Sequence, residues 1–252
     1  MRARLCLVVL AGLAVTGAAD ARAPAPQRGT LEAARAACAA GALTPVGSTR
    51  LAYAAVVRRR AVAFTRPGGR ELGRFGSVNA NRYPTVLGVL GAVTTRSCAF
   101  GWFRVQLPMR PNGVTGYVRA SAVQVLPVRT RIEIDLSAHR LTLFRAGRAV
   151  LRATVAVGAP ATPTPIGRYY VNQRLVPSSG ASGPYGPGAL GVSAFSNVLT
   201  GWAQGGPIGI HGTNEPWSIG RSISNGCIRV PNALLRRLFN ASYAGTPVVI
   251  HP

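Results

Sequence analysis

The sequence predicts a mainly β protein built in two parts. Glycine and proline are frequent, with 30 and 19 residues in a chain of 252, which favours turns and short strands over long helices. From about residue 48 onward, short apolar and β-branched runs alternate with turn signals. Pro127 separates two groups of such runs. We therefore expect two small β domains, with Pro127 in the linker between them.

The N-terminus has the pattern of a secretory signal peptide, predicted over residues 1–21. Met-Arg-Ala-Arg precedes an apolar run over residues 5–19, which ends in Ala19-Asp20-Ala21. The run is shorter than the roughly 20 residues of a membrane span, although an uncleaved anchor is the alternative. We expect an exported protein of the periplasm, cell wall or extracellular space, with no stable membrane span after cleavage.

Residues 22–45 are expected to form a linker and a short helix over residues 31–40, capped by Thr30 and ended by Gly41. Residues 46–126 then contain five or so predicted strands, which suggests a small barrel. The segments Trp-Phe-Arg-Val (102–105), Asn-Gly (112–113) and Gly-Tyr-Val (116–118) resemble bacterial SH3-like domains. Such a domain could bind peptide or act only as a spacer.

The second domain is predicted over residues 129–252. Ile132, Ile134 and Leu136 alternate with acidic residues, as in a half-buried strand. Residues 177–191 carry five glycines and three prolines, and long loops of this kind are often lids or binding loops. A helix is expected over residues 231–240, followed by a closing strand.

The charge is strongly positive, with 29 basic residues against 6 acidic ones and a net charge of +23. Every basic residue is arginine, and cleavage would remove only Arg2, Arg4 and Asp20. Such a field attracts polyanions. Because an exported protein rarely meets nucleic acid, we expect anionic cell-wall polymers as partners and no nucleic acid.

Three cysteines remain after cleavage: Cys38, Cys98 and Cys227. An odd number in an oxidising compartment leaves one unpaired. Cys227 stands in a glycine-containing turn among polar residues, which does not suit an inert buried thiol. Cys38 and Cys98 are then the candidate disulfide, and two buried free thiols are the alternative.

Cys227 and His211 are the candidate catalytic residues. At an ordinary pKa of about 8.5, only about 3% of a thiol is ionised at neutral pH, so a nucleophilic thiol needs a base, which could hold it as a thiolate–imidazolium pair. His139 sits in a predicted turn and His251 is penultimate. His211 follows a short apolar strand in the same segment as Cys227, which makes it the best base.

The neighbouring residues suggest how a substrate is held. Gly226 would let the amides of Asn225, Gly226 and Cys227 approach an oxyanion. Arg229 could bind a substrate carboxylate, or it could form a structural ion pair. Ser224 and Gly212 are further candidate substrate-binding residues. Glu215 is the only carboxylate in the segment 211–230, so we expect no metal site. We also expect no cofactor.

His211-Gly212-Thr213, followed by the run Ser-Asn-Gly-Cys-Ile-Arg over residues 224–229, resembles the signature of the L,D-transpeptidase catalytic domain, also called the YkuD domain. The resemblance covers about residues 129–252 and includes Val157-Gly158 and the run over residues 164–167. One position departs from the family pattern. Asn225 stands where the family commonly has a second histidine, and it cannot titrate near neutral pH.

The resemblance implies a β-sandwich with one or two short helices and with Cys227 on a loop. It implies that Cys227 attacks a peptidoglycan stem peptide, releases D-Ala and forms a thioester, which a stem amine resolves into a 3→3 cross-link. It also implies a role in cell-wall organisation and cell shape, and a carbapenem adduct at Cys227. An L,D-carboxypeptidase and a non-catalytic wall-binding protein are the alternatives. Removing residues 46–126 is expected to weaken wall retention more than acylation.

Overall fold

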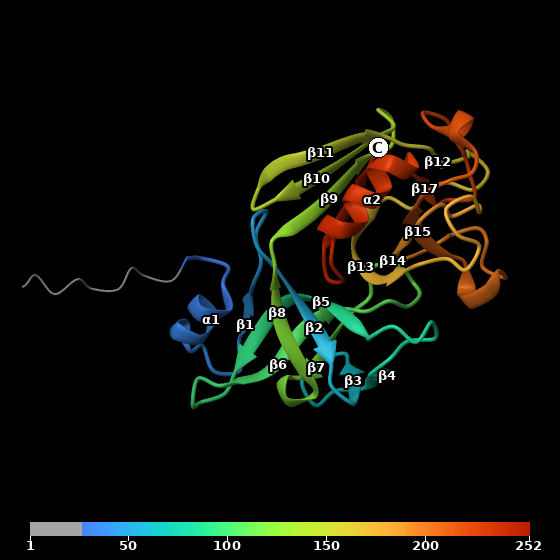
Figure 1. Ribbon diagram of the computed structural model, residues 1–252. Coiled ribbons are helices and arrows are strands. Elements are labelled where there is room, and N and C mark those ends of the chain that lie inside the picture. The colour runs from blue at the N-terminus through green and yellow to red at the C-terminus, as the bar shows by residue number, and fades with distance from the viewer. Residues whose placement is uncertain (1–26) are drawn as a thin grey trace, which may run out of the picture.

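The computed structural model describes residues 27–252, and the expected signal peptide lies outside this range. Within these residues the fold contains two eight-stranded sheets and one two-stranded sheet. Figure 1 shows the arrangement of the labelled strands. This confirms the mainly β prediction. Within residues 27–252, no helix has the length and apolar character needed to cross a membrane.

The first sheet follows one short helix and is antiparallel throughout. Its strand order is β4-β3-β7-β6-β5-β2-β8, and β1 pairs with β5. The elements are α1 (Leu31–Ala37), β1 (Leu43–Pro45), β2 (Ala52–Val57), β3 (Arg60–Phe64), β4 (Glu71–Gly76), β5 (Val86–Thr94), β6 (Phe100–Gln106), β7 (Thr115–Arg119), the 3₁₀ turn η1 (Ala120–Ala122) and β8 (Val123–Val128). Its core contains alanines and valines with Leu87, Phe103 and Leu107.

Helix α1 begins and ends for identifiable reasons. The side chain of Thr30 accepts a hydrogen bond from the amide of Ala33 at 3.0 Å, which confirms the predicted cap. The helix ends at Ala37, three residues before the predicted end, because Cys38 adopts a left-handed conformation with φ 44°. Cys38 forms a disulfide with Cys98, 60 residues further along the chain. The bridged alternative is therefore the one that the structure shows.

The second sheet has the strand order β11-β10-β9-β18-β13-β14-β15-β17. Its elements are β9 (Thr130–Asp135), β10 (Arg140–Arg145), β11 (Arg148–Thr154), β13 (Gly167–Leu175), β14 (Ala189–Phe195), β15 (Pro207–His211), β17 (Ile228–Arg229) and β18 (Pro247–His251). The remaining elements are β12 (Val157–Gly158) paired with β16 (Ser222–Ser224), the 3₁₀ turns η2 (Ala203–Gly205) and η3 (Pro216–Ser218), and α2 (Asn232–Ala241).

The strands of the second sheet and helix α2 pack around one apolar core. Alternate residues of β9 and β10, such as Ile132, Ile134 and Leu141, meet residues of β13–β15 and β18 there. Helix α2, predicted one residue earlier, adds Leu235 and Leu238, both fully buried. The sheet therefore folds as the expected sandwich, with the end of β15 and the start of β17 next to one another.

Pro127 does not lie in a linker, contrary to the prediction. It belongs to β8 and pairs with Tyr53 of β2. Strand β8 is the edge strand of its sheet, where the missing N–H of a proline is tolerated. Only Arg129 separates β8 from β9, so the two sheets are joined almost directly.

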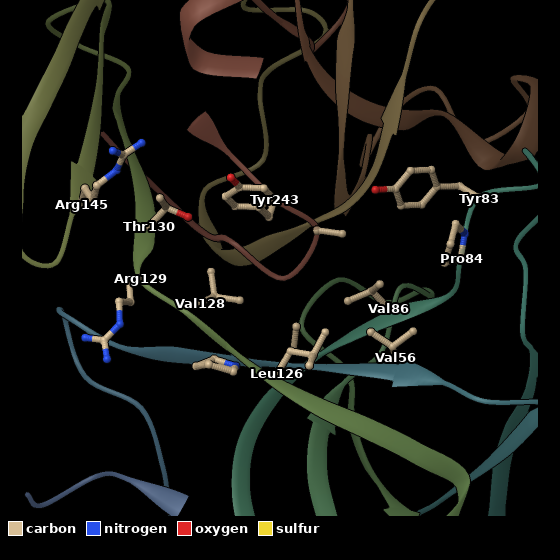
Figure 2. A pocket seen from close by; sticks show the side chains of 13 residues that line it. Val56, Tyr83, Pro84, Val86, Leu126, Val128, Arg129, Thr130, Arg145 and Tyr243 are labelled. Atoms are coloured by element: carbon tan, nitrogen blue, oxygen red, sulfur yellow. The ribbon is translucent and has the colours of Figure 1, made fainter. Parts of the chain in front are cut away.

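The two sheets also contact one another. The ring of Tyr170 lies so close to Gly88 that a Cβ added there would be 2.9 Å from Tyr170 Cδ1. A cavity of about 770 Å³ lies elsewhere between the sheets. Figure 2 shows Val56, Val86 and Leu126 along its floor, with Tyr83 and Tyr243 above them. No candidate site residue lines this cavity.

Replacing both Cys38 and Cys98 by serine should lower the free energy of unfolding by about 4 kcal/mol, because the bridge closes a long loop. Denaturant unfolding of the double variant and the wild type measures the difference. Reducing agent should cause the same loss in the wild type and none in the variant. Non-reducing peptide mapping that finds both thiols free in exported protein would contradict the bridge.

Candidate active site

The parallel pairing of β15 with β17 brings Cys227 and His211 together. Ile210 pairs with Ile228, and His211 pairs with Arg229, so Cys227 lies beside Gly209. The Gly209 amide donates a hydrogen bond to Cys227 Sγ at 3.4 Å. A Cβ added to Gly209 would lie 3.8 Å from His211 Cδ2. The thiol and the imidazole therefore both lie close to Gly209.

The hydrogen bonds of His211 define its tautomer. Its Nδ1 lies 2.6 Å from the carbonyl oxygen of Gly212, and a carbonyl oxygen can only accept. Nδ1 therefore carries the proton and donates, which leaves the lone pair on Nε2. The ring of Tyr185 packs edge-on against the imidazole, with centroids 5.0 Å apart. His211 is consequently buried, oriented and able to accept a proton at Nε2.

Burial favours the uncharged forms of both groups. It lowers the pKa of His211 to about 4, an effect that the Gly212 carbonyl opposes and the positive charge of Arg229 reinforces. Burial raises the pKa of the Cys227 thiol, which the Gly209 amide and Arg229 oppose. The resting site therefore contains a thiol and a neutral imidazole, in place of the thiolate–imidazolium pair considered from the sequence.

The turn that carries Cys227 is held by hydroxyl groups. Ser224 Oγ donates to the carbonyl oxygen of Cys227 at 2.5 Å. Thr164 Oγ1 donates to the carbonyl of Gly226 at 2.9 Å, and Thr162 Oγ1 donates to that of Ser224 at 3.0 Å. Ser224 is buried. It thus positions the turn, while its contact with substrate stays a prediction.

Two of the three predicted oxyanion amides are free. The Gly226 amide donates to Ser224 Oγ at 3.2 Å, whereas those of Asn225 and Cys227 have no hydrogen-bond acceptor within residues 27–252. Gly226 has φ +103°, a conformation that favours glycine. The exposed side chain of Asn225 forms no hydrogen bond within the same range. The free amides of Asn225 and Cys227 are therefore the donors available to an oxyanion.

Arg229 forms the ion pair that was the alternative to carboxylate binding. Its Nη1 donates to Glu215 Oε2, and both side chains are partly exposed. The Glu215 amide donates to Thr213 Oγ1 at 2.9 Å, which holds this part of the loop. Arg229 is therefore partly neutralised beside the thiol and the imidazole.

Gly212 is closely packed, and its contact with substrate stays a prediction. A Cβ there would lie 2.3 Å from Asn232 Oδ1 and 2.8 Å from Pro187 Cδ. Asn232 Oδ1 in turn accepts from the Thr213 amide at 2.9 Å. Gly212 thus lets the loop approach α2 while its carbonyl orients His211.

Sequence reasoning missed several residues at the site: Tyr185, Gly209, Asn232, and the threonines at 162 and 164. Tyr185 is the one aromatic residue of the loop predicted over residues 177–191, and this was the only feature of the sequence that could have indicated its role.

Two cavities lie near the loops that carry Cys227 and His211. One of about 600 Å³ is lined by Thr213 and Asn232 among others, and one of about 410 Å³ by Thr164 and Ser222 among others.

The comparisons with known proteins match part of this chain to L,D-transpeptidases. The family model of the YkuD L,D-transpeptidase catalytic domain matches residues 129–250. A putative L,D-transpeptidase YkuD of Bacillus licheniformis is 36% identical over 122 residues, which cover 48% of this chain and 66% of the relative. That of Bacillus subtilis is 34% identical over 120 residues, covering 48% and 65%. The chain thus spans just under two thirds of each relative's length.

Among solved structures, L,D-transpeptidase 3 from Mycobacterium tuberculosis aligns with a TM-score of 0.40 and 15% identity. The alignment covers 68% of this chain and 92% of that chain. The family match and the sequence relatives cover the second sheet. Residues 129–250 are therefore similar to the L,D-transpeptidase catalytic domain of the YkuD family.

Proposed function

We propose that this chain is a peptidoglycan L,D-transpeptidase that forms 3→3 cross-links through a thioester at Cys227. The observation that carries the proposal is the unpaired Cys227 thiol beside the same glycine as His211, whose Nε2 lone pair is free, within a YkuD domain. The substrate is the stem tetrapeptide, and D-Ala is the leaving group.

The proposed first half-reaction starts from the neutral pair. Cys227 Sγ attacks the carbonyl carbon between the third stem residue and D-Ala, while its proton passes to His211 Nε2. The free amides of Asn225 and Cys227 stabilise the oxyanion. When the C–N bond breaks, the imidazolium returns the proton to the D-Ala amine, which leaves a thioester and a neutral His211.

In the second half-reaction, an amine from another stem attacks the thioester and His211 accepts its proton. The C–S bond then breaks and the thiol is restored. Water in place of the amine would make the protein an L,D-carboxypeptidase. Product analysis with two stem peptides separates a cross-linked dimer from a hydrolysed tripeptide.

Arg229 retains N–H groups beyond the one bound to Glu215 and is proposed to contact a substrate carboxylate.

The rest of the chain supports a place in the cell envelope. We propose export by residues 1–21, contacts between the scattered arginines and anionic wall polymers, and an SH3-like domain over residues 46–126 ahead of the catalytic domain at 129–252. The seven-stranded antiparallel path β4 to β8 around a small apolar core supports the SH3-like assignment.

Replacing Cys227 by alanine or serine should abolish acyl-enzyme formation and leave the fold intact. A carbapenem should add its full mass to the wild type, measured by intact-mass spectrometry, and nothing to either variant. Circular dichroism of all three proteins provides the control for folding. A wild-type protein that gains no mass while its thiol remains reduced would favour the non-catalytic alternative.

Acylation should be nearly independent of pH from about 8 down to 5.5 and half-maximal near pH 4, because burial lowers the pKa of His211 to about 4. A histidine with an ordinary pKa would be protonated, and so unable to act as a base, below about pH 6.5. In His211→Gln, the remaining rate should instead rise with pH as the thiolate forms. Rates of carbapenem acylation across the pH range measure both profiles.

The same shift affects stability, so each pH needs a folding control. The folded-state pKa of His211 lies below its unfolded value, and the unfolded chain therefore binds the proton first as the pH falls. The contribution of His211 to the free energy of unfolding is fully present above about pH 6.5, and it decreases progressively as the pH falls towards 4. A wild-type acylation profile that drops near pH 6.5 while the protein stays folded would contradict the neutral pair.

Binding to purified wall sacculi should fall steeply with salt, because contacts between exposed charges are screened over about 8 Å at physiological ionic strength. Co-sedimentation across a salt series measures retention, and carbapenem acylation in the same buffers should change little. Salt-independent pelleting, or no pelleting at low salt, would show that the excess of arginine over acidic residues does not hold the protein on the wall.

A further inference from the structure

The loop after β6 reaches from the first sheet to the end of β14. Asn112 Nδ2 donates to the carbonyl of Phe195 at 2.8 Å, and the Phe195 amide donates to Asn112 Oδ1 at 2.9 Å. The paired register of β13 with β14 ends at Val171 and Val192. Beyond that point, the side-chain amide of Asn112 takes the place of a strand neighbour.

Arg110 holds the same segment from beside Asn112. Its Nη2 donates to the carbonyls of Ser196 and Gly205, at 2.6 and 2.7 Å. Ser196 and Gly205 lie on the outgoing and returning arms of the β14–β15 hairpin, which the bond from the Ser196 amide to the Gly206 carbonyl closes at 2.8 Å. One guanidinium therefore ties both arms with charge-assisted hydrogen bonds.

The hairpin leads directly into β15, which makes three contacts at the site. Ile208 lies under the turn before Cys227, since a Cβ on Gly226 would be 3.0 Å from Ile208 Cδ1. The Gly209 amide bonds the thiol, and His211 ends the strand. A shift of β15 along its axis would displace all three contacts at once, because they come from neighbouring residues of one strand. A shift by one residue would move each of them by about 3.3 Å.

We propose that Arg110 and Asn112 are positioning residues for the thiol–imidazole pair. They hold residues 195–206 so that β15 sets Gly209 and His211 against Cys227. The first sheet is thereby part of the catalytic unit, in contrast to the separable module expected from the sequence. The inference rests on the proposed function only for the reaction that the pair performs.

The test compares an Arg110→Ala, Asn112→Leu double variant with Gln106→Leu. Gln106 Nε2 donates to the Arg168 carbonyl across the same interface at 2.6 Å, and it does not touch the hairpin. Alkylation of Cys227 by iodoacetamide should be at least tenfold slower at pH 6.5 in the double variant. It should stay within twofold of wild type in Gln106→Leu.

The shape of the pH profile separates positioning from a loss of stability. In the wild type, the alkylation rate should be nearly flat around neutral pH because His211 accepts the proton. In the double variant it should rise with pH as the thiolate forms. Amide hydrogen exchange should accelerate in residues 206–211, and Arg110→Lys should recover most of the rate, because lysine can still donate to both carbonyls.

Equal slowing in Gln106→Leu, or a wild-type rate and profile in a folded double variant, would overturn the proposal. If the double variant does not fold, Asn112→Asp replaces it, since aspartate keeps the acceptor for the Phe195 amide and loses the donor. A wild-type protein that carbapenems do not acylate would refute the proposed function, whereas alkylation and hydrogen exchange would still decide the roles of Arg110 and Asn112.

Discussion

The parallel contact between β15 and β17 is the constraint on which the site depends. Parallel neighbours need a crossover connection, and here residues 212–227 provide it. The crossover has to return so that Cys227 lies opposite Gly209. Because side chains alternate along a strand, a slip of one residue would turn the thiol to the other face. The hydroxyls of Ser224, Thr162 and Thr164 hold the end of the crossover in this register.

The same arrangement explains why the pair is neutral at rest. The imidazole is covered by its own strand and by Tyr185, so that little water reaches it. Arg229 is close enough to lower both pKa values, and its ion pair with Glu215 balances its charge. A neutral pair transfers its proton as the new bond to carbon forms, so the thiol does not need to be ionised beforehand.

Several hydrogen bonds between the two sheets run from side chains of the first to backbone carbonyls of the second. Arg110, Asn112 and Gln106 of the first sheet bond carbonyls of the second. Backbone acceptors are present whatever the side chains are, so such bonds depend on the donor residues alone. Arg110 and Asn112, together with the short β8–β9 connection, are proposed to set the orientation of the hairpin that leads to His211.

The local pattern of the sequence determined much of this protein. The sequence predicted the strand periodicity, the Thr30 cap and helix α2, because each of these depends on residues only a few positions apart. Cys227 and His211 were identified from the number of cysteines, the few histidines and one short segment. The same segment carried the family resemblance, which the match over residues 129–250 bears out.

Only the tertiary structure decided the roles that depend on distant partners. That Ser224 holds the turn of Cys227 follows from its bond to a carbonyl three residues on, and that Arg229 is paired follows from the position of Glu215. Arg110 and Asn112 bond residues 83 to 95 positions away. The periodicity of a sequence indicates which face of a helix or strand is buried. Which element packs on that face depends on the tertiary arrangement of the whole chain.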